Sequence, residues 1–448
     1  MAVVNITEEL LDAIDRIVSS ELTEADDHQV RRCLLDYIGC AVGGSLEYAK
    51  VEQAVALFGM GSRRILGLQN TVSVVGSAFS NGFCSHVLEL DDGHRRAMQH
   101  LGAPVFSVLF AFANESTSWQ LFAKAVVAGY ETAVALGEAM QPRHKLEGFH
   151  ATGTCGTIGA TIAACVLMGY DRIQMRRAIS AAATSAAGLL EVIGEGSALK
   201  PYNVAHACAA AAAAVGMAEG PCNGPNDVLG GKRGFLTNYG GDPSKLTFGS
   251  NLRIHEIYTK PYSACRHCHS PIECVEKIMA ETGVAAGDVV SIRVDTYDLA
   301  VFGHDQKKVA NASEAKMSTP FGIASVLCGK GAYMDAYVPA NIADERIVRT
   351  MGLVEVLMDA ELTAACPEKR GARVSVELKD GSKQSCLVEY PKGEPENAMT
   401  DGDLGRKAFG LILAAGFNED DARRIVDTVW MSNDIYKLVL MCCKCCKE

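Results

Sequence analysis

The feature that most constrains this chain is a series of alanine- and glycine-rich segments in its first 260 or so residues, each with the apolar spacing of a helix. Glycine or proline separates most of them. Small side chains let helix axes approach closely, so the pattern predicts a compact bundle whose helices are buried on several sides. The segments are residues 30–42, 121–140, 157–168, 176–190 and 204–217.

After about residue 263 the pattern changes. Residues 289–297 alternate as in a strand, and residues 373–378 and 384–390 flank an Asp380-Gly381 turn, which is typical of a β-hairpin. Helical spacing then returns. We therefore expect a mostly α protein with a large all-helical domain (1–262), a smaller inserted α+β lid domain (263–395) and a C-terminal return to the helical domain (396–448).

Charge and composition exclude several classes of protein. The formal charge is -11, which argues against nucleic-acid binding and against adhesion to anionic membranes. No run of about 18 apolar residues would span a bilayer, and the acidic N-terminus does not read as a secretory signal. We expect a cytoplasmic protein whose 17 cysteines are reduced thiols rather than a disulfide framework.

The most polar constellation in the first half holds three carboxylates and three imidazoles within fifteen positions. Asp and His are suited to proton transfer near neutral pH, whereas solvated charged faces favour Lys and Glu. A helix that begins near residue 102 explains part of the pattern structurally, but function is the favoured interpretation. The residues are His86, Glu89, Asp91, Asp92, His94 and His100.

A second cluster contains His150 followed by glycines at 153, 156 and 159. The spacing is not that of a dinucleotide fingerprint and no strand precedes it, so close helix packing is the stronger interpretation. His150 itself is equally consistent with an anion ligand and a structural histidine. Lys200 precedes an apolar helix, where lysine more often reaches out to solvent than enters an active site.

A third cluster runs from Lys260 to His269 and contains Cys265-x-x-Cys268-His269. This is the haem c attachment pattern and also half of a zinc site. Haem attachment requires export, and a zinc site needs a second ligand pair, for which the C-terminal tail with Cys442, Cys443, Cys445 and Cys446 is the one candidate. We favour a cationic, titratable patch of Arg266, His267 and His269 between the domains, and an exposed, oxidisable tail.

Taken together, the three clusters resemble the MmgE/PrpD family, which includes 2-methylcitrate dehydratases, cis-aconitate decarboxylases and iminodisuccinate epimerases. The order and spacing of the motifs carry the resemblance across nearly the whole chain. Further matching segments are Leu35-Asp36-Tyr37-Ile38-Gly39, Lys200-Pro201, Gly230-Gly231-Lys-Arg-Gly234-Phe235, Glu314 to Phe321, Gly393 to Asn397 and Lys407-Ala-Phe409.

The resemblance implies a helical domain with an α+β lid, an active site in the cleft between them, a homodimer, and no metal or organic cofactor. It implies catalytic roles for His100, His269 and Glu89. It implies substrate-binding roles for His150, Lys200, Arg266, Asp91 and Asp92. Glu89 stands where decarboxylase-like members have Asp, Gly93 replaces a Thr, one residue is added before His100, and Phe321 replaces a Tyr.

The chemistry of these residue types fits a small polycarboxylate substrate. Removing a proton α to a carboxylate leaves charge that Lys200, Arg266 and a protonated His150 could stabilise, while His100 moves the proton. We therefore expect a cofactor-free, dehydratase-like lyase. The alternatives are a decarboxylase, an epimerase with His100 and His269 on opposite faces of one carbon, a member that only binds its carboxylate, and a metal-binding protein built on the Cys/His cluster.

Overall fold

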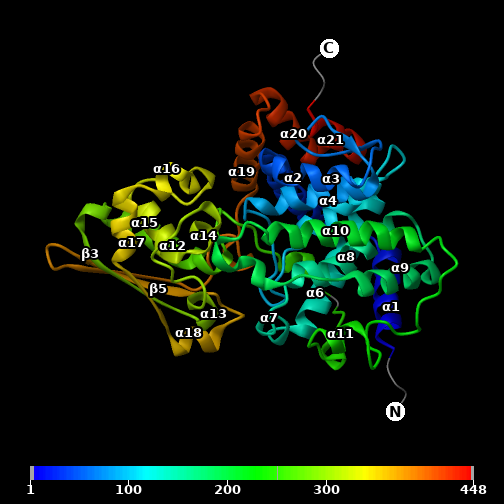
Figure 1. Cartoon of the computed structure of the whole chain (residues 1–448), viewed down its shortest axis with the longest axis horizontal. Coiled ribbons are helices and arrows are strands. Elements are labelled where there is room, and N and C mark those ends of the chain that lie inside the picture. The colour runs from blue at the N-terminus through cyan, green and yellow to red at the C-terminus, as the bar shows by residue number, and fades with distance from the viewer. Residues whose placement is uncertain (1–4, 250, 445–448) are drawn as a thin grey trace. The chain divides into compact units, whose positions relative to one another are not determined.

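The computed structural model describes residues 5–249 and 251–444, and helices predominate in it (Figure 1). The prediction of a mostly α fold is confirmed. The described residues form two compact units. Unit 1 comprises Met1–Val192, Leu199–Ile257 and Thr400–Glu448, and unit 2 comprises Ile193–Ala198 and Tyr258–Met399. The predicted domain boundaries, and the role of the smaller domain as a lid, stay predictions.

Unit 1 is helical apart from a two-stranded ladder of β1 (Arg63–Arg64) and β2 (Thr71–Val72). Its helix α8 is buried along its whole length and contacts α5, α6, α9 and α10. The helices are α1 (Ile6–Ser19), α2 (Glu24–Gly44), α3 (Glu52–Ala56), α4 (Val74–Val87), α5 (Gly102–Phe112), α6 (Trp119–Met140), α7 (Arg143–Leu146), α8 (Ala151–Leu167), α9 (Arg172–Ser185), α10 (Lys200–Met217), α11 (Phe235–Asn238), α19 (Asp401–Ala414), α20 (Glu419–Met431) and α21 (Ile435–Met441).

Glycine lets these helices approach closely. A Cβ atom added at Gly159 of α8 would lie 2.7 Å from the carbonyl oxygen of Gly129 in α6. One added at Gly153 would lie 2.3 Å from the carbonyl oxygen of Ala187. The glycines after His150 therefore serve helix packing, as the sequence predicted, and α8 has space only for small residues on these faces.

The predicted helices form, with one difference in length. The segment predicted as helical over 176–190 ends at Ser185 in α9. Beyond it, Gly188 accepts a hydrogen bond from the backbone N–H of His150, and the Leu190 N–H donates to Gly148. These bonds pair the segment with residues 148–150, so backbone pairing competes successfully with continuation of the helix.

Unit 2 contains a four-stranded sheet in the order β4-β3-β5-β6, in which only the β3–β4 pair is parallel. The predicted strand and the predicted hairpin are confirmed as β3, β5 and β6, and Gly381 supplies the positive φ of the turn. The elements are α12 (His269–Thr282), β3 (Val289–Thr296), α13 (Asp298–Val301), α14 (Ala312–Met317), α15 (Thr319–Leu327), α16 (Pro339–Ile342), α17 (Glu345–Gly352), β4 (Val354–Met358), α18 (Ala360–Ala365), β5 (Ala372–Leu378) and β6 (Lys383–Val388).

The cysteines near the C-terminus correct an expectation. Cys442 and Cys443 are buried, and the carbonyl oxygen of Cys442 accepts a hydrogen bond from the Gly67 N–H. The prediction of an exposed, oxidisable tail is therefore wrong for these two residues, because α21 carries them into unit 1. Cys445 and Cys446 lie outside the described residues. None of the described helices is both long and apolar enough to cross a membrane.

Candidate active site

The polar run between α4 and α5 folds back on itself inside unit 1. Glu89 and Met98 adopt positive φ values of 57° and 51°, and among the described residues they are the only non-glycine residues to do so. The backbone strain of such a conformation persists only where surrounding contacts enforce it, and it is concentrated at functional sites. The strained turns direct the side chains of this run toward one another.

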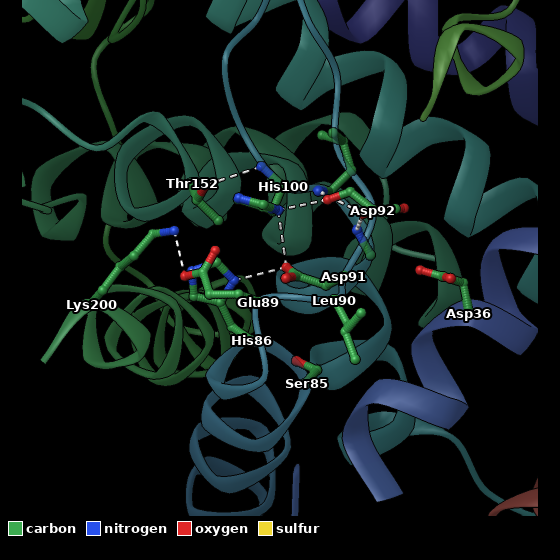
Figure 2. Close-up of polar contacts among 12 residues, drawn as sticks. Asp36, Ser85, His86, Glu89, Leu90, Asp91, Asp92, His100, Thr152 and Lys200 are labelled. Atoms are coloured by element: carbon green, nitrogen blue, oxygen red, sulfur yellow. Dashed lines mark hydrogen bonds and ion pairs between the residues drawn. The ribbon is translucent and has the colours of Figure 1, made fainter. Parts of the chain in front are cut away.

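Asp91 lies between two histidines (Figure 2). Its Oδ2 atom is 2.8 Å from Nδ1 of His86 and 3.1 Å from Nδ1 of His100. Nδ1 of His100 also donates to the carbonyl oxygen of Asp92 at 2.6 Å. These acceptors fix the proton on Nδ1, so Nε2 is the basic atom of a neutral His100.

The same contacts keep Asp91 ionised. Burial raises the pKa of Asp91, but the nearby His100 and His86 outweigh burial and hold that pKa well below its usual range. A fixed negative charge beside Nδ1 stabilises the imidazolium that forms when Nε2 takes a proton. The pair of Asp91 and His100 thus has the arrangement of a general base with its orienting carboxylate.

Asp92 faces the other way and supports the start of α5. Its Oδ1 accepts from the N–H groups of Leu101 and Gly102 at 3.2 and 2.8 Å, and Tyr130 donates to its Oδ2 at 2.7 Å. Burial raises the pKa of Asp92 to about 6, despite the hydrogen bond from Tyr130. Asp92 therefore positions His100 through its backbone carbonyl and anchors the helix that follows.

His150 occupies the N-cap position of α8 without a side-chain capping hydrogen bond. The centroid of its ring lies 6.0 Å from that of His86. Burial, followed by the charge of Lys200, lowers the pKa of His150 well below its ordinary value. The expectation of a protonated His150 is therefore wrong. Because the amide of Asn203 donates to Nδ1 at 3.2 Å, the neutral ring carries its hydrogen on Nε2 and can still donate to an anion.

Lys200 begins α10 and directs its ammonium group at Glu89, with Nζ 2.5 Å from Oε1 (Figure 2). The lysine therefore does not reach out to solvent. His86 lies beside this pair, with Nε2 3.9 Å from Oε1 of Glu89. Nε2 of His86 is buried and has no hydrogen-bond partner among the described residues, although its Nδ1 donates to Asp91. An unpartnered buried polar atom of this kind is a candidate contact for a ligand.

The site also depends on residues that the sequence did not single out for a role. Lys407 of α19 donates to Oδ1 of Asp36 at 2.7 Å and to the carbonyl oxygen of Leu90 at 2.5 Å. This buried ion pair fixes the backbone between Glu89 and Asp91. His86 belonged to the polar run without an assigned role, and its spacing of three residues from Glu89 was the available signal.

In unit 2, Arg266 and His269 bind each other and their own surroundings. Arg266 donates twice to Oε1 of Glu394, at 3.1 and 2.9 Å, and to the carbonyl oxygens of Pro391 and Lys392. It also donates to Nδ1 of His269, whose Nε2 donates to Ala264 at 3.1 Å. Arg266, His267 and His269 are all buried. A patch of these residues between the domains stays a prediction.

Two other features of unit 1 are separate from this cluster. His94, Glu138 and Glu256 form an ion-pair network with Arg96. A pocket of about 680 Å³ lies between α1 and the segment before Glu256. The predicted site residues do not line that pocket.

His86, Asp91 and His100 also lie close enough together to share a metal ion. In the structure both imidazoles direct Nδ1 at Asp91, so hydrogen bonds already account for the arrangement.

Comparison with known proteins gives matches over both units. Residues 8–246 match the MmgE/PrpD N-terminal domain, and residues 262–433 match the MmgE/PrpD C-terminal domain. The chain is 24% identical to a cis-aconitate decarboxylase-like protein, oryM, of Aspergillus oryzae, over 95% of this chain and 94% of that protein. It is 26% identical to a cis-aconitate decarboxylase of Aspergillus terreus, over 59% of this chain and 57% of that protein.

Proposed function

Because the chain belongs to the MmgE/PrpD family, we propose that it is a lyase that acts on a small di- or tricarboxylate by moving a proton α to a carboxylate. The observation that carries the proposal is the buried pair of Asp91 and His100 beside the donors of His150 and Lys200. The names of the two fungal relatives support a tricarboxylate as the substrate.

In the proposed reaction, Nε2 of His100 removes the proton, and Asp91 stabilises the resulting imidazolium. The electron pair moves toward the neighbouring carboxylate, where the ammonium of Lys200 and the Nε2–H of His150 offset the developing charge. Glu89 holds Lys200 in place before the substrate enters. Asp91 and Asp92 act as positioning residues, because carboxylates would repel an anionic substrate.

Dehydration is the first candidate for the step that follows. The imidazolium returns its proton to the leaving hydroxyl group, so water departs and a carbon–carbon double bond forms. The departures of Glu89, Gly93 and Phe321 from the decarboxylase-like pattern favour this candidate.

Decarboxylation is the second candidate, and the relatives named cis-aconitate decarboxylases favour it. Here the electron pair comes from the bond to the departing carbon dioxide, and a protonated imidazole delivers its proton to carbon. Both candidates use the same imidazole and the same cationic groups. They differ in the bond that breaks and in the starting state of His100, which is a neutral base in dehydration and a protonated acid in decarboxylation.

Arg266 and His269 have no assigned step in this proposal, and a substrate-binding role of Arg266 stays a prediction. Arg266 is held by Glu394 and in turn donates to His269. A direct catalytic role of His269, and with it the epimerase alternative, stays a prediction.

The test is a screen of the purified full-length chain against citrate, methylcitrate, cis-aconitate, tartrate and iminodisuccinate. Alkene absorbance, carbon dioxide release and solvent deuterium uptake are measured for each compound. We expect turnover of at least one tricarboxylate, with deuterium entering at the carbon next to a carboxylate. A His100→Asn variant is the control, because asparagine keeps a donor near the position of Nδ1.

The outcomes separate the candidates. Alkene formation without carbon dioxide supports dehydration, and carbon dioxide release supports decarboxylation. Deuterium exchange with inversion and no loss of either group would replace the lyase by an epimerase. Turnover by His100→Asn equal to that of the unaltered chain would contradict the assigned base.

A further inference from the structure

A second cluster of chemically active side chains lies inside unit 2. Cys265, His267 and His304 each offer one ligand atom, and these three atoms lie within 4.8 Å of one another. We propose that they form a metal site for a divalent transition metal that accepts sulfur and nitrogen ligands, with Zn²⁺ as the matching ion. This site is independent of the proposed lyase activity.

Two segments that are distant in sequence bring the ligands together. Cys265 and His267 lie at the turn that leads into α12, and His304 follows α13. The backbone N–H of Cys265 donates to Lys316 at 2.9 Å, and the carbonyl oxygen of His304 accepts from Thr319 at 2.9 Å. Both segments are therefore tied to the same short stretch around α14 and α15, which holds the ligands in place without a metal.

Each imidazole is oriented by a hydrogen bond on its other nitrogen. Nδ1 of His304 donates to the carbonyl oxygen of Met317 at 2.7 Å, and Nδ1 of His267 lies 2.7 Å from the hydroxyl of Tyr297. Histidine ligands of metals show this same second contact, which fixes the ring and the tautomer. Nε2 of His304 faces Sγ of Cys265, and we assign Nε2 of His267 as the second nitrogen ligand.

The distance between Cys265 and His304 is close to that required by a tetrahedral ion. Sγ of Cys265 lies 3.8 Å from Nε2 of His304. Zn–S and Zn–N bonds of about 2.3 and 2.0 Å at a tetrahedral angle would place these two atoms about 3.5 Å apart. A contraction of a few tenths of an ångström would therefore bring both atoms to bonding distance.

The ligand set differs from the one that the sequence motif suggested. His269 of the Cys-x-x-Cys-His motif directs its ring at Ala264 and Arg266, away from a role as ligand. Cys442 and Cys443 are buried in unit 1 and contact residues 65–67 there. His304, which no motif indicated, replaces them. Cys268 donates to the Met317 carbonyl at 3.6 Å, beside the cluster.

The test uses the full-length chain, stripped of metal with a chelator and titrated with Co²⁺ as a spectroscopic probe. We expect one cobalt ion per chain with a thiolate-to-cobalt absorption band that Zn²⁺ abolishes by displacement. Cys265→Ser should remove the band. Tyr297→Phe should retain the band but weaken Co²⁺ binding by roughly 10- to 100-fold, because the second contact of a ligand histidine is lost.

Cys328→Ser is the matched control, since Cys328 is a partly buried cysteine of the same unit outside the cluster. It should bind Co²⁺ like the unaltered chain. If Cys265→Ser fails to fold, His304→Gln tests the same site, and it should also lose the band.

No thiolate band in the unaltered chain, or a band that survives both Cys265→Ser and His304→Gln, would overturn the proposal. A band that disappears only in the double variant Cys445→Ser, Cys446→Ser would assign the metal to the terminal cysteines instead.

Discussion

Units 1 and 2 each contain a histidine, a cation and a carboxylate in close contact, but they use them differently. In unit 2 the guanidinium of Arg266 donates to Glu394, to two backbone carbonyls and to His269. In unit 1, Nε2 of His86 has no hydrogen-bond partner within residues 5–249 and 251–444. The neutral ring of His150 carries a hydrogen on Nε2. Residue type alone therefore does not distinguish a structural cluster from a reactive one. The distinction lies in how many donor and acceptor atoms of the cluster are already hydrogen-bonded to neighbouring residues.

The largest expected effect is on catalysis in unit 1. His100→Asn should lower kcat by roughly 10²- to 10⁴-fold, the range for loss of a general acid or base. The measurement is steady-state kinetics on the substrate found in the screen. The same substitution at His269, whose two ring nitrogens both have partners in unit 2, should lower kcat far less. An equal loss at His269 would break the comparison and support the predicted catalytic role of His269.

The second effect is on stability in unit 2. Arg266→Gln should lower the free energy of unfolding by about 3–5 kcal/mol, because it leaves Glu394 buried without its cation. Urea denaturation measures the change. Adding Glu394→Gln to this variant should restore much of the loss. As the counterpart in unit 1, His150→Gln should lower the free energy of unfolding by only about 1 kcal/mol, which is the typical contribution of one hydrogen bond.

The third effect is a pH dependence that arises in unit 1. The pKa of Asp92 is about 6 in the folded protein and about 3.9 in the unfolded chain. The folded protein is therefore about 3 kcal/mol more stable to unfolding when Asp92 is protonated in both states than when it is ionised in both. This contribution is complete below pH 4 and is lost as the pH rises through 6. Asp92→Asn should therefore gain stability relative to the unaltered chain as the pH is raised from 4 to 7. Urea denaturation at several pH values measures the difference, and a constant difference would contradict the raised pKa.

The smallest effect concerns backbone strain. Glu89→Gly and Glu89→Gln both remove the ion pair with Lys200, but only glycine relieves the positive φ of 57°. Glu89→Gly should therefore unfold with a free energy about 1 kcal/mol higher than Glu89→Gln. Equal stabilities of the two variants would show that the turn is not strained.

The sequence predicted the elements whose determinants are local. Apolar spacing and small residues located the long helices of unit 1, and the Asp380-Gly381 turn located the β5–β6 hairpin. The run from His86 to His100 was also found, because its residues are close in sequence. The end of α9 was missed, since it depends on pairing with residues 148–150.

Contacts between distant residues explain the rest of what was missed. The pair of Asp36 and Lys407 spans 371 positions. His304 lies near Cys265 because backbone hydrogen bonds tie both segments to residues 316–319. Asp36 and Lys407 stand in segments that match the family, but no local pattern pairs them, and no motif marks His304. Neutral His150 was missed for a related reason, because its pKa depends on burial that only the packed structure creates. The homodimer and the cytoplasmic location stay predictions.

The contact of Lys407 with Leu90 has a consequence for how the chain can be divided. Leu90 separates Glu89 from Asp91, and the residue that holds its carbonyl comes more than three hundred positions later. A fragment cut after the helices of the first 246 residues would contain every proposed acid, base and cation of unit 1. It would lack the ammonium group that holds the loop in shape and that pairs with the carboxylate of Asp36. Residues 400–444 therefore belong in any minimal version of unit 1.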